Sequence, residues 1–261
     1  MNNLRRTIKQ LILEATRENQ LKDLALFHHE ASNKKHYYLL FHPSLAEDII
    51  NVSNHWAGSS SEFVIKALAE SKHIYGMIIA RPPGEKSFPC LGSWEIILAA
   101  AKSGWGPTMY DIVMGDSPNG IMSDREQVTK HAKPLYDFYY KNREDVEKIA
   151  LDDKDHHYTP RPKDDCTWGS DGDYKAYMVA VDEESDGRPT KKNLWYADTL
   201  NYVYNREKTS HRAQMEDNYF NAIKELQYWD ILNGSNTENF VWWRKVMHAF
   251  FDEQDKKRNY G

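Results

Sequence analysis

The sequence predicts an α/β domain in which helices flank a mixed β-sheet. Strand-like and helical segments alternate between residues 32 and 150, which is typical of this class. One apolar run, residues 94–100, leads into a turn with two glycines and then into a helical pattern. A hydrophobic content of 40% across 261 residues is enough for a substantial core. We expect the domain at residues 32–150, with a helical leader before it and an aromatic-rich extension after it.

Residues 1–31 are predicted to form an amphipathic helical leader. Four apolar side chains fall on one helical face and three basic ones flank it: Leu4, Ile8, Leu11 and Ile12, with Arg5, Arg6 and Lys9. Because a helix this short is marginal by itself in water, its apolar face needs a docking surface. That surface belongs either to the protein's own domain or to a protein partner or second copy.

The first half of the domain contains two strand-like segments and a helical one. The composition of residues 36–42 is typical of a strand, and the segment 73–80 has the same character until prolines at 82 and 83 end it. Residues 60–71 between them are predicted to be helical.

The centre of the domain is predicted to be a strand, a tight turn and a helix. Residues 94–100 form the strand, and Gly104 and Gly106 allow the chain to reverse. Pro107 suits the first helical position because its φ is preset and it has no N–H to lose. The residues from Ser123 to Glu126 have the form of a capping box, which predicts a second helix beginning near Asp124.

Two motifs in this region resemble the GNAT acyltransferases. Their first motif reads Arg/Gln-x-x-Gly-x-Gly/Ala at a strand-to-helix turn, and the sequence Ala-Lys-Ser-Gly-Trp-Gly at 101–106 fits it except in the first place. Their later motif, Ala-x-x-Leu/Phe-Tyr, is matched by Ala-Lys-Pro-Leu-Tyr at 132–136. The resemblance covers roughly residues 60 to 145 and implies a GNAT-like mixed sheet flanked by helices.

The resemblance implies acyl transfer from acetyl-CoA or another acyl-CoA to an amine. The glycine turn would hold the CoA pyrophosphate on backbone N–H groups. By analogy Tyr136 is the acid that returns a proton to the departing thiolate, and Glu95, on the strand before the turn, is the candidate base. The residues expected to bind the cofactor are Lys102, Ser103, Gly104, Trp105, Gly106 and Thr108.

Structural readings of the same residues stay open. The two glycines are also compatible with a turn that binds no ligand. Tyr136 lies in an aromatic-rich stretch and fits a core position, and Glu95 fits an outward-facing edge position.

The alternative function is a virion or assembly protein that keeps a GNAT-like fold without catalysis. The start of the chain is similar to leader sequences of tailed-phage proteins, some of which direct packaging into the head and are cut after glutamate. That analogy implies cleavage at Glu14–Ala15 or Glu30–Ala31 and a location in the host cytoplasm or in the virion. A third reading is an inhibitor or adaptor of a host protein.

Residues 151–261 are predicted to be a loop-rich and helical extension. His156, His157 and Cys166 lie among acidic residues, but their spacing matches no closed zinc pattern, so no metal is expected. A strand is predicted at 174–181, and helices at 222–232 and 239–252. The many aromatic side chains of this part either pack these helices or form an interface with another chain.

Composition excludes several classes of protein. Cys90 and Cys166 are the only cysteines, so a disulfide framework is not expected and a reducing cytoplasm is the natural setting. No apolar run reaches the roughly 18 residues that a membrane helix needs. A net charge of −5 argues against a generally nucleic-acid-binding surface.

Overall fold

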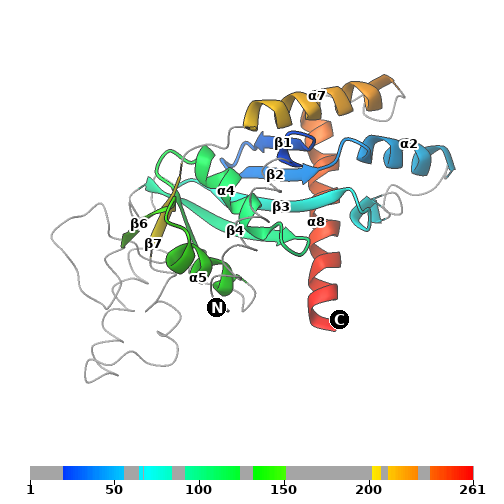
Figure 1. Cartoon of the computed structure of the whole chain (residues 1–261). Coiled ribbons are helices and arrows are strands. Elements are labelled where there is room, and N and C mark those ends of the chain that lie inside the picture. Colours follow the sequence, from blue (N-terminus) through cyan, green and yellow to red (C-terminus); the bar gives the residue numbers. More distant parts are fainter. Residues whose placement is uncertain are drawn as a thin grey trace.

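A seven-stranded mixed sheet organises the chain in the computed structural model, which confirms the predicted α/β class (Figure 1). The structure describes residues 20–55, 65–66, 68–83, 92–123, 132–150, 202–206, 211–228 and 236–260. The strands are β1 (Ala25–Glu30), β2 (His36–Phe41), β3 (Ile74–Arg81), β4 (Trp94–Ala101), β5 (Ile121–Ser123), β6 (Glu147–Ala150) and β7 (Tyr202–Asn205). The helices are α2 (Leu45–His55), α4 (Gly106–Asp116), α5 (Lys133–Asn142), α7 (Arg212–Tyr228) and α8 (Asn236–Tyr260).

The strand order is β1-β2-β3-β4-β5-β7-β6. Strands β1 to β4 pair antiparallel in sequence order, whereas β5 pairs parallel to β4 after the crossover through α4. β7 lies between β5 and β6 and is antiparallel to both. Among the described strands, β4 and β5 are therefore the one parallel pair in an otherwise antiparallel sheet.

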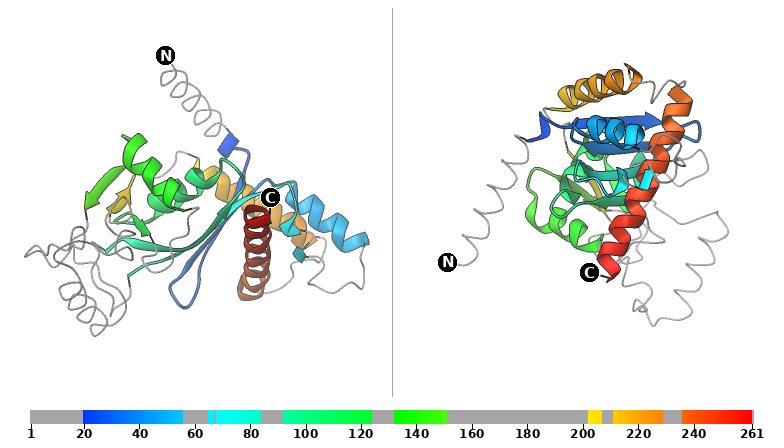
Figure 2. Two further views of the ribbon diagram at one scale, coloured as in Figure 1. Left: turned by 90° about the horizontal axis from the view of Figure 1, so that it is seen from below. Right: turned by 90° about the vertical axis from the view of Figure 1, so that its right-hand side faces the viewer.

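Helices cover the sheet on both faces (Figure 2), and each face buries its own apolar cluster. α2 and α8 pack on one face, where Leu39 and Met77 meet Trp243 of α8. α4 and α5 pack on the other face, while α7 runs along β1 at the edge. Side chains of a strand point alternately to the two faces. Because both faces of the sheet are covered, β2 is buried along its whole length.

Several predicted elements are confirmed. The strands expected at 36–42, 73–80 and 94–100 correspond to β2, β3 and β4, and the glycine turn leads directly into α4. Pro107 lies in the first turn of α4, as expected, and Pro134 has the equivalent place in α5. Within the helix predicted at 60–71, residues 65, 66, 68 and 69 are helical, and 60–64 lie outside the described residues. The helix start predicted near Asp124 also lies outside them.

α2 was not predicted. Its start nevertheless carries local signals, since Ser44 precedes it and Glu47 and Asp48 lie in its first turn, where acidic groups favour the helix dipole.

The boundary of the N-terminal leader is corrected by the structure. Residues 25–30 are strand β1 and pair antiparallel with β2, so the helical prediction for 1–31 is wrong there. Leu26 and Phe27 are buried in the clusters on opposite faces of the sheet, a pattern that pairing with β2 imposes. Glu30–Ala31 lies at the turn from β1 to β2. Residues 1–19, including Glu14–Ala15, lie outside the described residues.

The C-terminal part belongs to the same fold. β7 lies inside the sheet and Trp243 and Phe250 of α8 are fully buried, so the boundary predicted at residue 150 divides a single sheet and core. α7 and α8 are longer than the helices predicted at 222–232 and 239–252. Aromatic side chains of both helices pack into the core, although Phe220 on α7 is 58% exposed. Residues 151–200, with the predicted strand at 174–181 and with His156, His157 and Cys166, lie outside the described residues.

Candidate functional site

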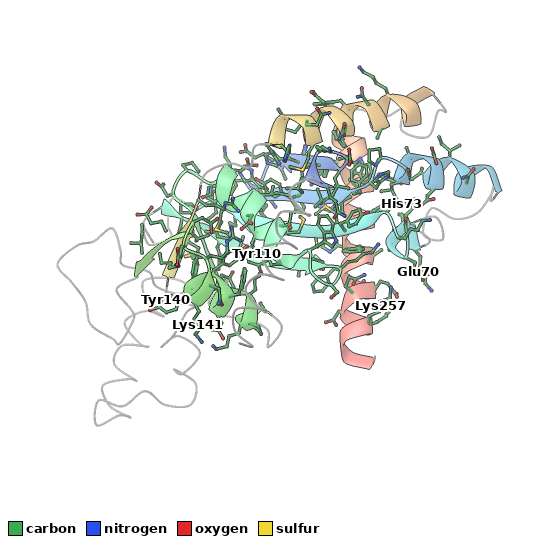
Figure 3. All side chains as sticks on the ribbon, in the orientation of Figure 1. Glu70, His73, Tyr110, Tyr140, Lys141 and Lys257 are labelled. Carbon is green, nitrogen blue, oxygen red and sulfur yellow. The ribbon has the colours of Figure 1, made fainter. Side chains whose placement is uncertain are left out.

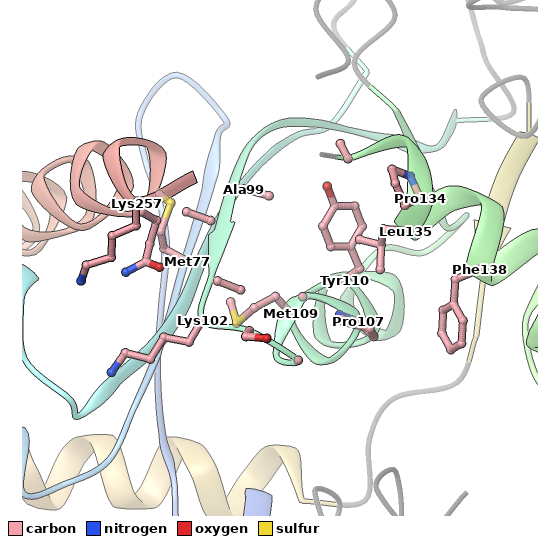
Figure 4. A pocket seen from close by; sticks show the side chains of 17 residues that line it. Met77, Ala99, Lys102, Pro107, Met109, Tyr110, Pro134, Leu135, Phe138 and Lys257 are labelled. Atoms are coloured by element: carbon pink, nitrogen blue, oxygen red, sulfur yellow. The ribbon is translucent and has the colours of Figure 1, made fainter. Parts of the chain in front are cut away.

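A cavity lies beyond the point where the described pairing of β4 with β5 ends. In the described residues β5 pairs with β4 from Trp94 to Ile96, and β4 then continues to Ala101. One extra residue, Ile97, interrupts the register between β3 and β4 at this point, a bulge that increases the local twist. Beyond it a cavity of about 610 Å³ opens between the end of β4, the turn, α4, α5 and α8 (Figure 4). Ligands of open α/β sheets bind outside the carboxyl ends of parallel strands in this way.

The turn that floors the cavity offers unpaired backbone N–H groups. Gly104 has a φ of +86°, a left-handed conformation that favours glycine. The N–H of Trp105 donates to the carbonyl of Lys102, 3.0 Å away, and closes the turn. The N–H groups of Ser103, Gly104, Gly106 and Thr108 make no hydrogen bond to the described part of the chain.

The start of α4 is suited to an anion. Its N-cap residue, Trp105, makes no side-chain capping bond, so the helix dipole is left without a negative group at this end. A Cβ added at Gly106 would meet no atom within 4 Å, and Gly106 lines the cavity. No aspartate or glutamate is among the described residues that line it. Together these features fit a phosphate-bearing ligand.

The walls of the cavity are mostly apolar, with a few polar groups. Figure 4 shows β4 and α5 on opposite sides; Leu135 and Phe138 belong to α5, and Pro107 lies at the start of α4. The hydroxyl of Tyr110, one helical turn after Gly106, points into this space. An apolar cavity with a few convergent polar groups is typical of small-molecule sites.

Buried hydrogen bonds and ion pairs connect α4, which lines the cavity, to α5. The Tyr139 hydroxyl lies 2.7 Å from the carbonyl oxygen of Pro107 and 2.8 Å from Asp111 Oδ1. Arg143 and Arg206 form ion pairs with Asp111, 3.2 and 2.6 Å away. Burial raises the pKa of Asp111, and the two arginines act in the opposite direction. This network fixes the first turn of α4 relative to α5.

Four of the six predicted cofactor residues line the cavity: Lys102, Ser103, Gly104 and Gly106. The ring of Trp105 packs against Tyr75, with centroids 4.5 Å apart, and Thr108 is buried, so neither lines the cavity. The Lys102 amine donates to the carbonyl of Ser71, 2.9 Å away, and points away from the gap between β4 and α5 (Figure 4).

Glu95 lies on β4 but does not line the cavity. Its carboxylate pairs with Arg81 on β3, the residue in register with it, and its side chain is 16% exposed. Ala99, the nearest lining residue on β4, lies four positions after Glu95, which is about 13 Å along a strand.

Tyr136 is 2% exposed and lies behind the cavity wall. Its ring packs against Tyr110 and Tyr204, both at 5.7 Å between centroids. Burial, and then Tyr110 with its hydrogen bond, raise the pKa of Tyr136 well above its usual value. Tyr136 therefore reaches the cavity only through Tyr110, the residue that the sequence interpretation missed. Helical spacing could have indicated it, since Gly106 and Tyr110 are four residues apart and share a face.

The α8 contribution to the cavity was also missed. Gln254 and Lys257 line it from α8, on which Lys257 is labelled in Figure 3, and Figure 4 shows Lys257 and Tyr110 on opposite sides of β4. No local signal connects these residues to a turn about 150 positions earlier, because only the packing of α8 across the sheet brings them together.

Comparison with known proteins leaves the site to be interpreted from its geometry. No family model, curated protein sequence or solved structure matches the chain. No described helix is long and apolar enough to cross a membrane. Within the described ranges, no group of three or more histidine, cysteine, aspartate or glutamate side chains could hold a metal ion.

Proposed function

We propose that this protein is an acyl-CoA-dependent N-acyltransferase with a GNAT-like fold. The observation that carries the proposal is the cavity at the carboxyl end of β4, whose floor holds N–H groups at the start of α4 that make no hydrogen bond to described residues. Its position at the parallel pair of the sheet, after a strand-turn-helix unit, agrees with the place that the sequence resemblance implies for CoA. Its volume of about 610 Å³ suits a small-molecule ligand.

Different residues of the cavity would bind different parts of the cofactor. The N–H groups of Ser103, Gly104 and Gly106 would hold a phosphate of the cofactor at the helix N-terminus. The apolar side chains of Leu135 and Phe138 would exclude water from the arm that carries the acyl group. When bound, acyl-CoA supplies an acyl group activated as a thioester.

The geometry favours Tyr110 as the group that donates a proton to the leaving thiolate. Its hydroxyl reaches the cavity, whereas Tyr136 stands behind it and supports it through their hydrogen bond. Glu95 remains the proposed base. Since it is paired with Arg81 and lies about 13 Å along β4 from the lining, it would accept the proton of the amine only through a chain of several water molecules.

Binding of acetyl-CoA tests the proposal directly. Isothermal titration of the full chain with acetyl-CoA should give one site, and ligand at 100 times Kd should stabilise the protein by about 2.7 kcal/mol in a melting experiment. ATP, which carries phosphates but no pantetheine arm, is the control for general anion binding. Absence of acetyl-CoA binding, or equal binding of ATP, would contradict the proposal.

The second candidate is a phage virion or assembly protein without catalysis. The position on α7 at which it can be tested is Phe220, whose aromatic side chain is 58% exposed. In that case association would use this surface or residues 1–31. A protein that ignores acetyl-CoA but loses association on Phe220→Asp substitution would support this function in place of acyl transfer.

A further inference from the structure

The cavity reaches both faces of β4. Ala99 and Ala101 belong to the side packed by α4 and α5, whereas Ala100 and Met77 belong to the side packed by α8. All four line the same cavity, which therefore passes around the edge of β4 where β5 no longer pairs with it. A ligand on the α8 side can thus meet a ligand on the α4 side at this edge.

The α8 side contributes an amide side chain to the lining of the cavity. Gln254 is 8% exposed, lines the cavity and makes no hydrogen bond to any described residue. A primary amide has two donor hydrogens and an acceptor oxygen. In the lining of the cavity these groups are available to hydrogen-bond a ligand.

The same side carries positive charge. Lys257 lies three residues after Gln254 on the same helical face and also lines the cavity. Lys257 forms an ion pair with Glu253 at 3.3 Å. Burial is the main cause that lowers the pKa of the Lys102 amine, and the positive charge of Lys257 lowers it further. An anion placed between these two lysines would relieve their repulsion.

We propose that the α8 side of the cavity binds the acyl acceptor, and that Gln254 and Lys257 select an amine that also carries a carboxylate. This inference rests on the proposed acyltransferase function. The phosphates of CoA already have the free N–H groups of the turn, whereas Gln254 and Lys257 stand on the other face of β4. The carboxylate would pair with Lys257, and Gln254 would bond to a polar group beside it.

The reaction then balances without any further reagent. The amine nitrogen attacks the thioester carbon, so a C–N bond forms and the C–S bond breaks. The amine loses one proton to the base and the thiolate gains one from the acid, while the carboxylate remains on Lys257. The product is an N-acylated amino acid or a related acid.

Matched acceptors test the inference. The full chain is given acetyl-CoA with free amino acids and dipeptides or with the corresponding carboxamides, and released CoA thiol is measured. At least one carboxylate acceptor should react tenfold or more faster than its carboxamide. Lys257→Gln should raise KM for that acceptor about tenfold and leave the Kd for acetyl-CoA unchanged, and Gln254→Met should act in the same direction. The control is Lys256→Gln, an exposed position of α8 outside the lining with the same change of charge.

The failures are distinguishable. If acetyl-CoA does not bind, the acyltransferase function and this inference both fall. If acetyl-CoA binds but carboxamides react as well as carboxylates, or Lys257→Gln behaves as Lys256→Gln does, only the inference falls. A weaker Kd for acetyl-CoA in Lys257→Gln would assign this lysine to the cofactor and overturn its role toward the acceptor. Titration with N-acetyl amino acids adds a readout of product binding, which Lys257→Gln should weaken.

Discussion

Two glycines of the same turn should respond differently to substitution. Gly106→Val places a side chain in the open space of the cavity, so acetyl-CoA binding should weaken at least tenfold while the melting temperature changes little. Gly104→Ala puts a Cβ on a left-handed residue and should cost about 1 kcal/mol of stability. Calorimetric titration and thermal melting of both variants measure the two effects. Equal loss of stability in both would contradict a ligand role for Gly106.

Substitution of Tyr110, whose hydroxyl faces the cavity, and of Tyr136, which is buried behind it, should also have different effects. Tyr110→Phe removes the hydroxyl that faces the cavity and should lower kcat about 100-fold, with little change in KM for acetyl-CoA. Tyr136→Phe removes a buried hydrogen bond and should cost about 1 kcal/mol of stability with a smaller effect on kcat. Steady-state kinetics and chemical unfolding measure these changes. A larger kcat defect in Tyr136→Phe would return the acid role to Tyr136.

At the scale of elements, a histidine pair connects the β1–β2 hairpin to α7. Arg212 can only donate, so its contact with His28 Nδ1 at 3.2 Å makes that nitrogen an acceptor. His28 Nε2 then carries the hydrogen and donates to His36 Nδ1, 3.1 Å away. Both rings are therefore neutral. Burial accordingly lowers the pKa of His36, and also that of His29 on β1.

This arrangement predicts a loss of stability in acid. Because the folded state disfavours protonation of His36, its contribution is complete above the ordinary pKa of 6.5 and declines as the pH falls below it. The free energy of unfolding, measured from pH 8 to 5, should be level at first and then fall. His36→Phe keeps an aromatic ring on Trp94 and should reduce the slope, whereas His248→Gln on the exposed side of α8 should not. An unchanged slope in His36→Phe would contradict this account.

Two N-terminal deletions distinguish the leader from the sheet. Removing residues 1–31 removes β1, and Leu26 and Phe27 each contribute about 1.5–3 kcal/mol by burial, so the product should be strongly destabilised. Removing residues 1–19 leaves β1 in place. A lower melting temperature of that shorter deletion would show a leader docked on its own domain, and lost association at unchanged stability would show a leader for assembly. A full-stability protein lacking 1–31 would contradict the place of β1 in the sheet.

At the scale of the whole molecule, the C-terminal helices should unfold together with the sheet. Trp243 of α8 is fully buried and stacks on Phe27 of β1 and Phe41 of β2, with centroids 5.7 and 5.3 Å apart. Trp243→Ala should therefore cost about 3–5 kcal/mol without splitting the transition. Urea unfolding followed by circular dichroism and by tryptophan fluorescence tests this. Two separate transitions would indicate an independent extension.

The sequence by itself determined the local elements of this protein. The apolar runs of β2, β3 and β4 and the glycine turn before α4 could be predicted, because strand composition, left-handed glycine and proline in a first helical turn act over a few residues. The two glycines of the turn that lines the cavity, Gly104 and Gly106, could be predicted from the same local signals. The α2 helix was missed although its start carries them.

Only the tertiary structure decided which distant segments share the sheet and the cavity. β1 is a strand because β2 pairs with it, and β7 enters between β5 and β6 from far along the chain. Gln254 and Lys257 line the same cavity as the turn because α8 packs across β3 and β4. Tyr136 does not line the cavity because the ring of Tyr110 packs between them. These outcomes depend on apolar burial and strand pairing between remote residues, whose energies no local sequence pattern contains.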